Sequence, residues 1–163
     1  MKRYSSHFPD PVVLVTVVAN GKTNVMTVGW VTPVSFTPPI LMISVAPERY
    51  THDLLVQAGE FGVSILADNQ KKLSTIAGTQ SGKKVDKLDR TEFELIDSEL
   101  ISAPLIKGAR AWYECKIVAR HVIGDHTAFF GEVLRSDADE SKMPLILFNR
   151  KYYSLGDECG VYP

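Results

Sequence analysis

Short apolar runs rich in β-branched residues recur along the chain and predict strands. The first, Val12 to Ala19, is followed by Asn20-Gly21, a pair that accepts positive φ and favours a tight hairpin. A partner strand is expected from Thr23 to about Trp30, and a further buried strand from Ile40 to Ala46. The segment between these two is dense in Thr, Ser and Pro. We expect it to be a rigid loop whose prolines free its backbone groups from the sheet.

The remainder of the chain adds two short helices to this pattern. One is expected after Thr51, as its N-cap, up to Gly59; the other follows Asp68 or Asn69 and ends at Gly78. Further strands are expected at Phe61 to Leu66, Phe93 to Ile96, Ala109 to Ile123, Thr127 to Leu134, Leu145 to Phe148 and Tyr152 to Leu155. Many short strands with few helices predict a mainly β chain, a small β-barrel with a few short peripheral helices, forming a single domain over residues 1–163.

The strand expected from 109 to 123 alternates apolar and polar side chains. On this pattern Cys115 faces the core and Glu114 faces solvent. A Gly124-Asp125 turn then leads into His126, which is either an ordinary turn residue or a functional group at the mouth of a site.

Composition narrows the class of protein. With 18 basic and 19 acidic residues the formal net charge is −1, which gives no general attraction to nucleic acid or to an anionic membrane. No apolar run is long enough for a transmembrane helix, and the start has no apolar segment typical of a secretory signal, so a cytoplasmic location is expected. Two cysteines and four histidines show no metal-ligand spacing, and Cys115 and Cys159 are expected to be reduced.

The motifs of the common catalytic sites are absent from the sequence. There is no GxSxG elbow and no Walker or Rossmann glycine pattern. Any redox or nucleotide chemistry must therefore use another fold.

Five segments, in order, carry a resemblance to a known family. They are VVLVTVV at 12–18, TVGWVTPVSFTPPILMISVAPERYTHDLLVQAGEF at 27–61, SGKKVDK at 81–87, GDHTAFFGEV at 124–133 and RKYYSLG at 150–156. Together they resemble the flavin reductase-like proteins, small FMN-binding split barrels, and are most similar to the flavoredoxin and ferric-reductase branch. The resemblance implies a six-stranded Greek-key split β-barrel, a homodimer, one FMN per subunit, and reduction by NADH or NADPH.

The resemblance also implies which residues contact the cofactors. The flavin ring would lie against the segment Thr27, Gly29, Trp30, Val31, Thr32, Pro33 and Val34. The phosphate would lie near Arg49, Tyr50 and Thr51 and near Ser81, Lys83 and Lys87 of the basic loop. Arg49 and the start of a helix suit a phosphate dianion, because both present N–H donors and positive potential. His126 would help to hold the nicotinamide. Gly29 departs from the family, where Ser is frequent.

Several alternatives stay open at this point. Trp30 could be an ordinary core residue, Arg49 a surface residue paired with Glu48 or Glu60, and the lysines a solvated loop. The protein could be an NAD(P)H-dependent reductase of flavin or ferric chelates, or a flavoredoxin-like FMN carrier reduced by a protein partner. A split barrel that has lost flavin and serves as an interaction domain is a third reading. The choice between NADH and NADPH, the use of FMN or FAD, and the electron acceptor are not defined by the sequence.

Overall fold

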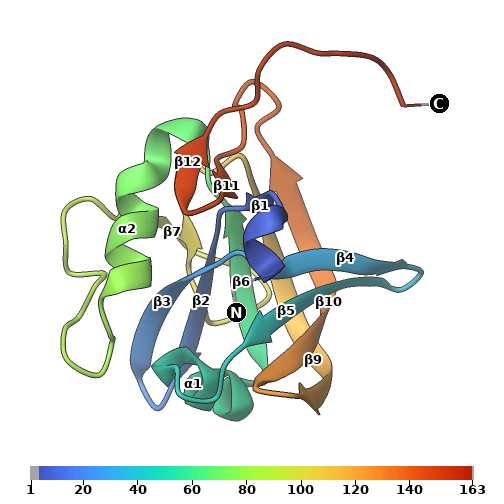
Figure 1. Ribbon diagram of the computed structural model, residues 1–163. Helices are drawn as coiled ribbons and strands as arrows, with labels where there is room; N and C mark the ends of the chain where they lie inside the picture. The colour runs from blue at the N-terminus through green and yellow to red at the C-terminus, as the bar shows by residue number, and fades with distance from the viewer. Residues whose placement is uncertain (1–3, 163) are drawn as a thin grey trace.

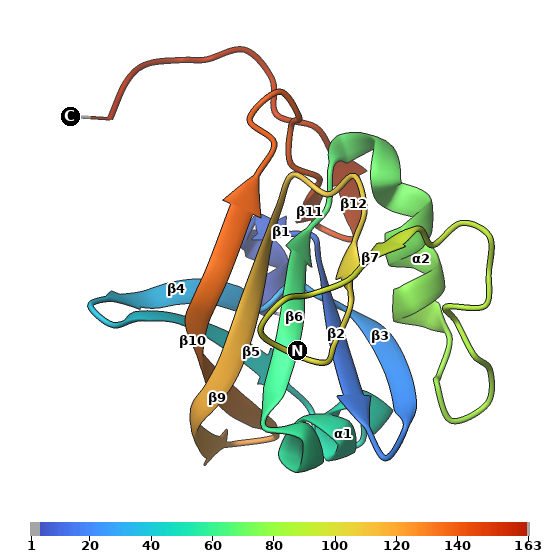
Figure 2. The same ribbon diagram turned by 180° about the vertical axis from the view of Figure 1, so that it is seen from behind.

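A seven-stranded antiparallel sheet dominates the computed structural model, which describes residues 4–162 (Figure 1). Its strands are β2 (Val13–Ala19), β3 (Lys22–Val28), β4 (Val31–Phe36), β5 (Pro39–Val45), β6 (Glu60–Ile65), β9 (Ala111–Ile123) and β10 (His126–Ala138). They are arranged in the order β3-β2-β6-β9-β10-β5-β4. The sheet curls around its inner face, and the hairpin of β4 and β5 projects from one side (Figures 1 and 2).

Smaller elements surround this sheet. Two further sheets are formed by β1 (Asp10–Pro11), β11 (Ile146–Phe148) and β12 (Lys151–Tyr153), and by β7 (Leu95–Ile96) and β8 (Leu105–Ile106). The helices are α1 (Tyr50–Ala58) and α2 (Lys71–Thr79), with 3-10 turns η1 (Tyr4–His7) and η2 (Asp68–Gln70). Helix α1 covers one end of the curled sheet, and α2 lies along β3 (Figure 1). No helix within residues 4–162 is long and apolar enough to cross a membrane.

Two groups of buried side chains form the core. The larger lies inside the curled sheet and includes Ile43, Phe61 and Phe129, each with no exposed surface. The smaller joins α2 to the outer side of β2 and includes Leu14 and Leu73. Burial of this much apolar surface is the main source of stability in a chain of this size.

The predicted fold class is confirmed at the coarse level: the chain is mainly β with two short α-helices. The six-stranded barrel is not confirmed. The sheet contains seven strands, and within residues 4–162 its edge strands β3 and β4 do not pair with each other. Two local predictions hold. Asn20 and Gly21 take φ values of 52° and 70° at the β2–β3 turn, and Gly59 ends α1 with φ of 72°.

The predicted unpaired loop from Trp30 to Ser35 is wrong. Residues from Val31 onward form β4, which pairs with β5 in antiparallel register from Val31 opposite Ile43 to Phe36 opposite Pro39. A register shift lies between Pro33 and Ser35. Proline is tolerated here because β4 is an edge strand, where one side of the backbone needs no ladder partner. Only Gly29 and Trp30 separate β3 from β4.

The predicted helix boundaries also need correction. Arg49, not Thr51, occupies the N-cap position of α1, and no side chain caps it. The Thr51 hydroxyl instead accepts a hydrogen bond from Asn24 Nδ2 at 2.8 Å, inside the protein. In α2 the helix continues one residue beyond Gly78, and η2 precedes its first turn. The first cap was misplaced because the Thr51 hydroxyl is bonded to Asn24, and the second because Asp68 and Asn69 belong to η2.

The expectation that Glu114 faces solvent is wrong as well. Its side chain has no exposed surface, because the segment at 97–104 packs over that face of β9. The carboxylate accepts hydrogen bonds from the backbone N–H groups of Glu99 and Leu100, at 3.1 and 2.6 Å, and from Arg135 at 3.4 Å. Cys115 is also buried, so strict alternation fails at this point.

Candidate functional site

A cavity of about 710 Å³ lies where β3, β5 and the β9–β10 turn meet the start of α1. We name it the Trp30 cavity. Five of the predicted site residues line it: Thr27, Gly29, Trp30, Arg49 and His126. The volume falls within the range of small-molecule sites, roughly 300–1,000 Å³. The fold therefore brings together residues that are up to about a hundred positions apart in the sequence.

Trp30 and His126 form one wall of this cavity. Their ring centroids are 4.7 Å apart and their planes meet at 39°. Trp30 is 37% exposed, so it is not a core residue. His126 Nδ1 lies 2.7 Å from Asp125 Oδ1, and this hydrogen bond, with the charge of the imidazole, lowers the pKa of the Asp125 carboxyl. The result is an aromatic surface with one oriented imidazole, which suits a flat ring ligand.

Thr27 lines the cavity, but its hydroxyl is not available to a ligand. That hydroxyl donates to the Ser74 carbonyl oxygen at 2.7 Å and so ties β3 to α2. Gly78 of α2 lines the same cavity, and a Cβ built on it would lie 3.3 Å from Thr27. The helix can approach β3 this closely because position 78 has no side chain.

Arg49 also lines the Trp30 cavity, and it occupies the N-cap position of α1. It is exposed, and it makes none of the ion pairs found within residues 4–162, so the pairing with Glu48 or Glu60 considered above is not formed. A guanidinium beside the first turn of a helix is suited to a phosphate. Thr51 is 2% exposed and its hydroxyl is bonded to Asn24, so only its backbone belongs to that first turn.

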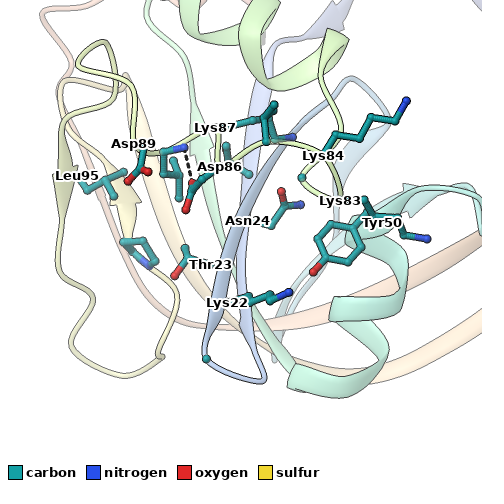
Figure 3. Close-up of a pocket in the computed structure, with 16 residues that line it drawn as sticks. Lys22, Thr23, Asn24, Tyr50, Lys83, Lys84, Asp86, Lys87, Asp89 and Leu95 are labelled. Atoms are coloured by element: carbon teal, nitrogen blue, oxygen red, sulfur yellow. Dashed lines mark hydrogen bonds between the residues drawn. The ribbon is translucent and has the colours of Figure 1, made fainter.

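A second cavity, of about 620 Å³, is lined by three of the other predicted phosphate residues, Tyr50, Lys83 and Lys87 (Figure 3). We name it the lysine cavity, because Lys22, Lys83, Lys84 and Lys87 line it together with Tyr50. Its walls come from the β2–β3 hairpin, the start of α1 and the loop at 82–89. Two acidic residues of that loop, at positions 86 and 89, share the lining and offset part of the positive charge.

The lysines of this loop differ in their surroundings. Lys87 is 4% exposed, and its ammonium donates to the carbonyl oxygens of Ala77 and Gln80, at 3.1 and 3.2 Å, at the end of α2. Burial lowers the pKa of Lys87 to about 8. Lys83 is exposed, 4.0 Å from Asp53 and 5.8 Å from the centre of the Tyr50 ring. The Lys87 ammonium is thus bonded within the protein, whereas the Lys83 ammonium is exposed at the cavity.

Ser81 and the β4 residues lie elsewhere. The Ser81 hydroxyl accepts the backbone N–H of Lys83 at 3.3 Å and shapes the loop. Val31 and Thr32 line a separate cavity of about 450 Å³, which shares Gly29 and Trp30 with the Trp30 cavity. Pro33 lines an apolar cavity of about 290 Å³ under the β4–β5 hairpin, and Val34 is 47% exposed on that hairpin. The predicted ring-contact segment is therefore divided among several surfaces.

Metal and thiol chemistry find no support in the described part of the chain. Residues 4–162 contain no group of three His, Cys, Asp or Glu side chains that could hold a metal ion. Both cysteines are free. Burial, with the adjacent Glu114 charge, raises the pKa of the Cys115 thiol to about 12, so that thiol stays protonated.

The sequence interpretation missed several residues of the Trp30 cavity. Asp10 comes from β1, Ala46 from the end of β5, Glu48 from the turn before α1, and Leu147 from β11. Only Gly78 carried a usable signal, since glycine inside a helix implies close packing. The places of Asp10 and Leu147 depend on how β1 and β11 pair, which no local pattern encodes.

Comparison with known proteins identifies related sequences. The model described as "Flavin reductase like domain" matches residues 5–156. An NADH-dependent FAD reductase of Streptomyces globisporus is 36% identical over 135 residues, covering 82% of this chain and 72% of that protein. StyB, an NADH-dependent flavin reductase of Pseudomonas fluorescens, is 31% identical over 143 residues, covering 86% and 79%. An uncharacterised protein of Archaeoglobus fulgidus is 41% identical over 113 residues, which span 69% of this chain and 64% of that protein.

Solved structures share the whole fold. The NADH:FAD oxidoreductase SgcE6 of Streptomyces globisporus C-1027 superposes with a TM-score of 0.89 at 29% identity, covering 96% of this chain and 92% of that one. A flavoredoxin from Methanosarcina acetivorans gives a TM-score of 0.87 at 30% identity, covering 99% and 94%.

Proposed function

Because the chain belongs to the flavin reductase-like domain family, we propose that it is an NAD(P)H:flavin oxidoreductase with its flavin in the Trp30 cavity. The observation that carries the proposal is the meeting of Trp30, His126 and Arg49 around one cavity of about 710 Å³. These three side chains come from separate parts of the chain and match the ring, nicotinamide and phosphate requirements of the reaction.

The side chains present fit a flavin mononucleotide. The Trp30–His126 wall offers aromatic surface to the isoalloxazine ring. Arg49 and the first turn of α1 offer N–H donors to the phosphate, and Arg49 has no competing ion pair within residues 4–162. The cavity is large enough for such a ligand. FMN is the proposed flavin, since one arginine and one helix end account for one phosphate.

A bound flavin supplies the hydride chemistry, and the protein supplies position and electrostatics. Trp30 fixes the plane in which the ring lies. Asp125 holds His126 through Nδ1, which leaves Nε2 as the ring nitrogen available to a ligand. Arg49 anchors the phosphate and so sets the distance from that anchor to the His126 wall. Free flavin, a ferric chelate or an acceptor protein would be the electron acceptor.

A flavoredoxin-like electron carrier is the second candidate. It is favoured by the superposition on the Methanosarcina flavoredoxin, which spans almost the whole chain. In that case the same cavity holds FMN, but a protein partner rather than NAD(P)H reduces it.

Anaerobic stopped-flow spectroscopy separates these candidates. Protein loaded with FMN is mixed with NADH or with NADPH while the flavin absorbance band is followed. Rapid bleaching with at least one nucleotide is expected of a reductase. Bound FMN that neither nucleotide bleaches identifies the carrier, and failure to bind FMN contradicts both and favours an interaction domain.

We also propose that the protein forms a homodimer in the cytoplasm. The β4–β5 hairpin projects from the body of the molecule (Figure 2), with Phe36 93% exposed and Val34 47% exposed on it. Exposed apolar groups on a projecting hairpin suit contact with a second copy. Sedimentation equilibrium is expected to give twice the chain mass for the wild type, and Phe36→Asp is expected to shift it towards the monomer; a monomeric wild type contradicts the dimer.

A further inference from the structure

Asp10 is a charged residue of the Trp30 cavity to which the proposed flavin site assigns no role. It belongs to the short strand β1, where it pairs with Leu147 of β11, and both residues line the Trp30 cavity. Asp10 also lines the neighbouring cavity of about 450 Å³, again together with Gly29 and Trp30. Its backbone pairs in the sheet, which places its side chain at the wall that the two cavities share.

Gly29 and Asp10 fit together closely. A Cβ built on Gly29 would lie 3.2 Å from Asp10 Cβ, 3.4 Å from its Cγ and 3.4 Å from its Oδ2. The carboxylate thus occupies the space into which a side chain at position 29 would extend. Gly29 does not have a positive φ, so the backbone alone does not demand glycine there. The missing side chain makes room for Asp10 instead.

The chemistry of a carboxylate restricts what it can contact. It accepts hydrogen bonds only, and it repels phosphate. Asp10 takes part in none of the ion pairs within residues 4–162, and burial raises the pKa of its carboxyl. A partly desolvated carboxylate of this kind is well suited to accept a hydrogen bond from a ligand N–H. Arg49, in the same cavity, provides the complementary site for the phosphate.

We propose that Asp10 is the specificity residue for the flavin ring, accepting a hydrogen bond from the imide N–H of the isoalloxazine in the space left open by Gly29. This inference rests on the proposed function, because it requires the flavin to occupy the Trp30 cavity. The imide is the N–H donor of the oxidised ring, and Asp10 adjoins Trp30, the proposed wall for that ring. The carboxylate therefore selects the ring end, while Arg49 selects the phosphate end.

The test uses two flavins that lack phosphate, so that Arg49 does not contribute. Riboflavin keeps the imide N–H, and 3-methylriboflavin replaces it with a methyl group. Titrations of intrinsic fluorescence give the dissociation constants for the wild type, Asp10→Ala and Asp10→Asn. We expect Asp10→Ala to weaken riboflavin about tenfold, since a charge-assisted hydrogen bond is lost, and Asp10→Asn to weaken it about threefold. Neither substitution is expected to weaken 3-methylriboflavin.

A swap variant sharpens the result. Gly29→Ser in the wild type is expected to weaken riboflavin, because its Cβ displaces the Asp10 carboxylate. In the Asp10→Ala background the same Gly29→Ser is expected to strengthen binding, because its hydroxyl takes the empty place as an acceptor. Opposite signs in the two backgrounds measure direct coupling between positions 10 and 29.

The possible outcomes distinguish the role proposed for Asp10 from the proposed function on which it rests. A wild type that binds neither riboflavin nor FMN overturns the proposed function. A wild type that binds riboflavin while Asp10→Ala binds it equally well overturns only the role of Asp10. Equal weakening of riboflavin and 3-methylriboflavin, with unchanged thermal unfolding, overturns the imide contact and assigns the carboxylate to a ribityl hydroxyl. Should Asp10→Ala fail to fold, Asp10→Asn with the two flavins decides the same question.

Discussion

The Trp30 cavity and the lysine cavity lie on either side of the start of α1, and they differ in how their positively charged side chains are bonded. Arg49 lines the first and its neighbour Tyr50 lines the second. The lysine cavity has more positive side chains, yet the most buried of them, Lys87, already donates to two carbonyl oxygens of the protein. Arg49 makes no ion pair within residues 4–162. This difference between Arg49 and Lys87 is the reason why we propose Arg49, and not Lys87, as the phosphate ligand.

The same contrast holds for the hydroxyls of the two regions. Thr27 and Thr51 were both predicted to contact flavin. In the structure both hydroxyls form hydrogen bonds within the protein, to Ser74 and Asn24 respectively. Gly29, which has no side chain, is the position that leaves room for a functional group, the carboxylate of Asp10. Residue type alone therefore does not show whether a hydroxyl is bonded to a distant element of the protein.

The largest expected effect comes from Lys87→Met, which should alter stability and not binding. The substitution leaves the Ala77 and Gln80 carbonyl oxygens without their donor at the end of α2. We expect a loss of about 2–4 kcal/mol in the free energy of unfolding, measured by urea denaturation. The dissociation constant for FMN should change by less than about twofold. Unchanged stability with much weaker FMN binding would make Lys87 a ligand residue.

A smaller loss of stability is expected for Thr51→Val. The valine keeps the shape but removes the acceptor for Asn24 Nδ2, which leaves a buried amide donor unpaired. Urea unfolding should show a loss of about 1.5 kcal/mol. FMN affinity should not change, and a tenfold loss of affinity would restore Thr51 as a phosphate contact.

Arg49→Ala, compared with Lys83→Ala, tests the two cavities directly. Both residues are exposed cations near the start of α1, so the pair is matched in type and exposure. Arg49→Ala should weaken FMN about tenfold and leave riboflavin unaffected, because only FMN carries the phosphate. Lys83→Ala should change neither by more than about twofold. The reverse result would move the phosphate to the lysine cavity.

The smallest effect concerns pH. Burial lowers the pKa of Lys87 from 10.5 to about 8 in the folded protein. Between these values the unfolded chain holds a proton that the folded protein has released, so stability contributed by this group rises with pH. Between about pH 7.5 and pH 9 the wild type should gain about 1 kcal/mol relative to Lys87→Met, measured by urea denaturation at each pH. Parallel curves for the two proteins would show that Lys87 is not desolvated.

The sequence predicted the strands more reliably than the site. Local rules sufficed at Asn20-Gly21 and Gly59, where the backbone itself demands positive φ. They failed at Pro33, because an edge strand tolerates proline and nothing local reveals which strand is at the edge. Glu114 was assigned to the surface because the covering segment comes from a different part of the chain.

Within the candidate site, two predicted residues meet across the chain. Trp30 lies in the short link between β3 and β4, and His126 is the first residue of β10. The place of Asp10 in the cavity could not be predicted, because it depends on the pairing of β1 with β11 and on the absent side chain at Gly29. Such a pair becomes visible only when the fold places its members side by side.

The most direct measurement is a crystal structure of the protein with FMN bound. We predict electron density for the isoalloxazine ring against Trp30 and His126 in the Trp30 cavity, with the phosphate on Arg49 and the start of α1. Density for FMN in the lysine cavity, or a ring that does not contact Trp30, would contradict the proposed site.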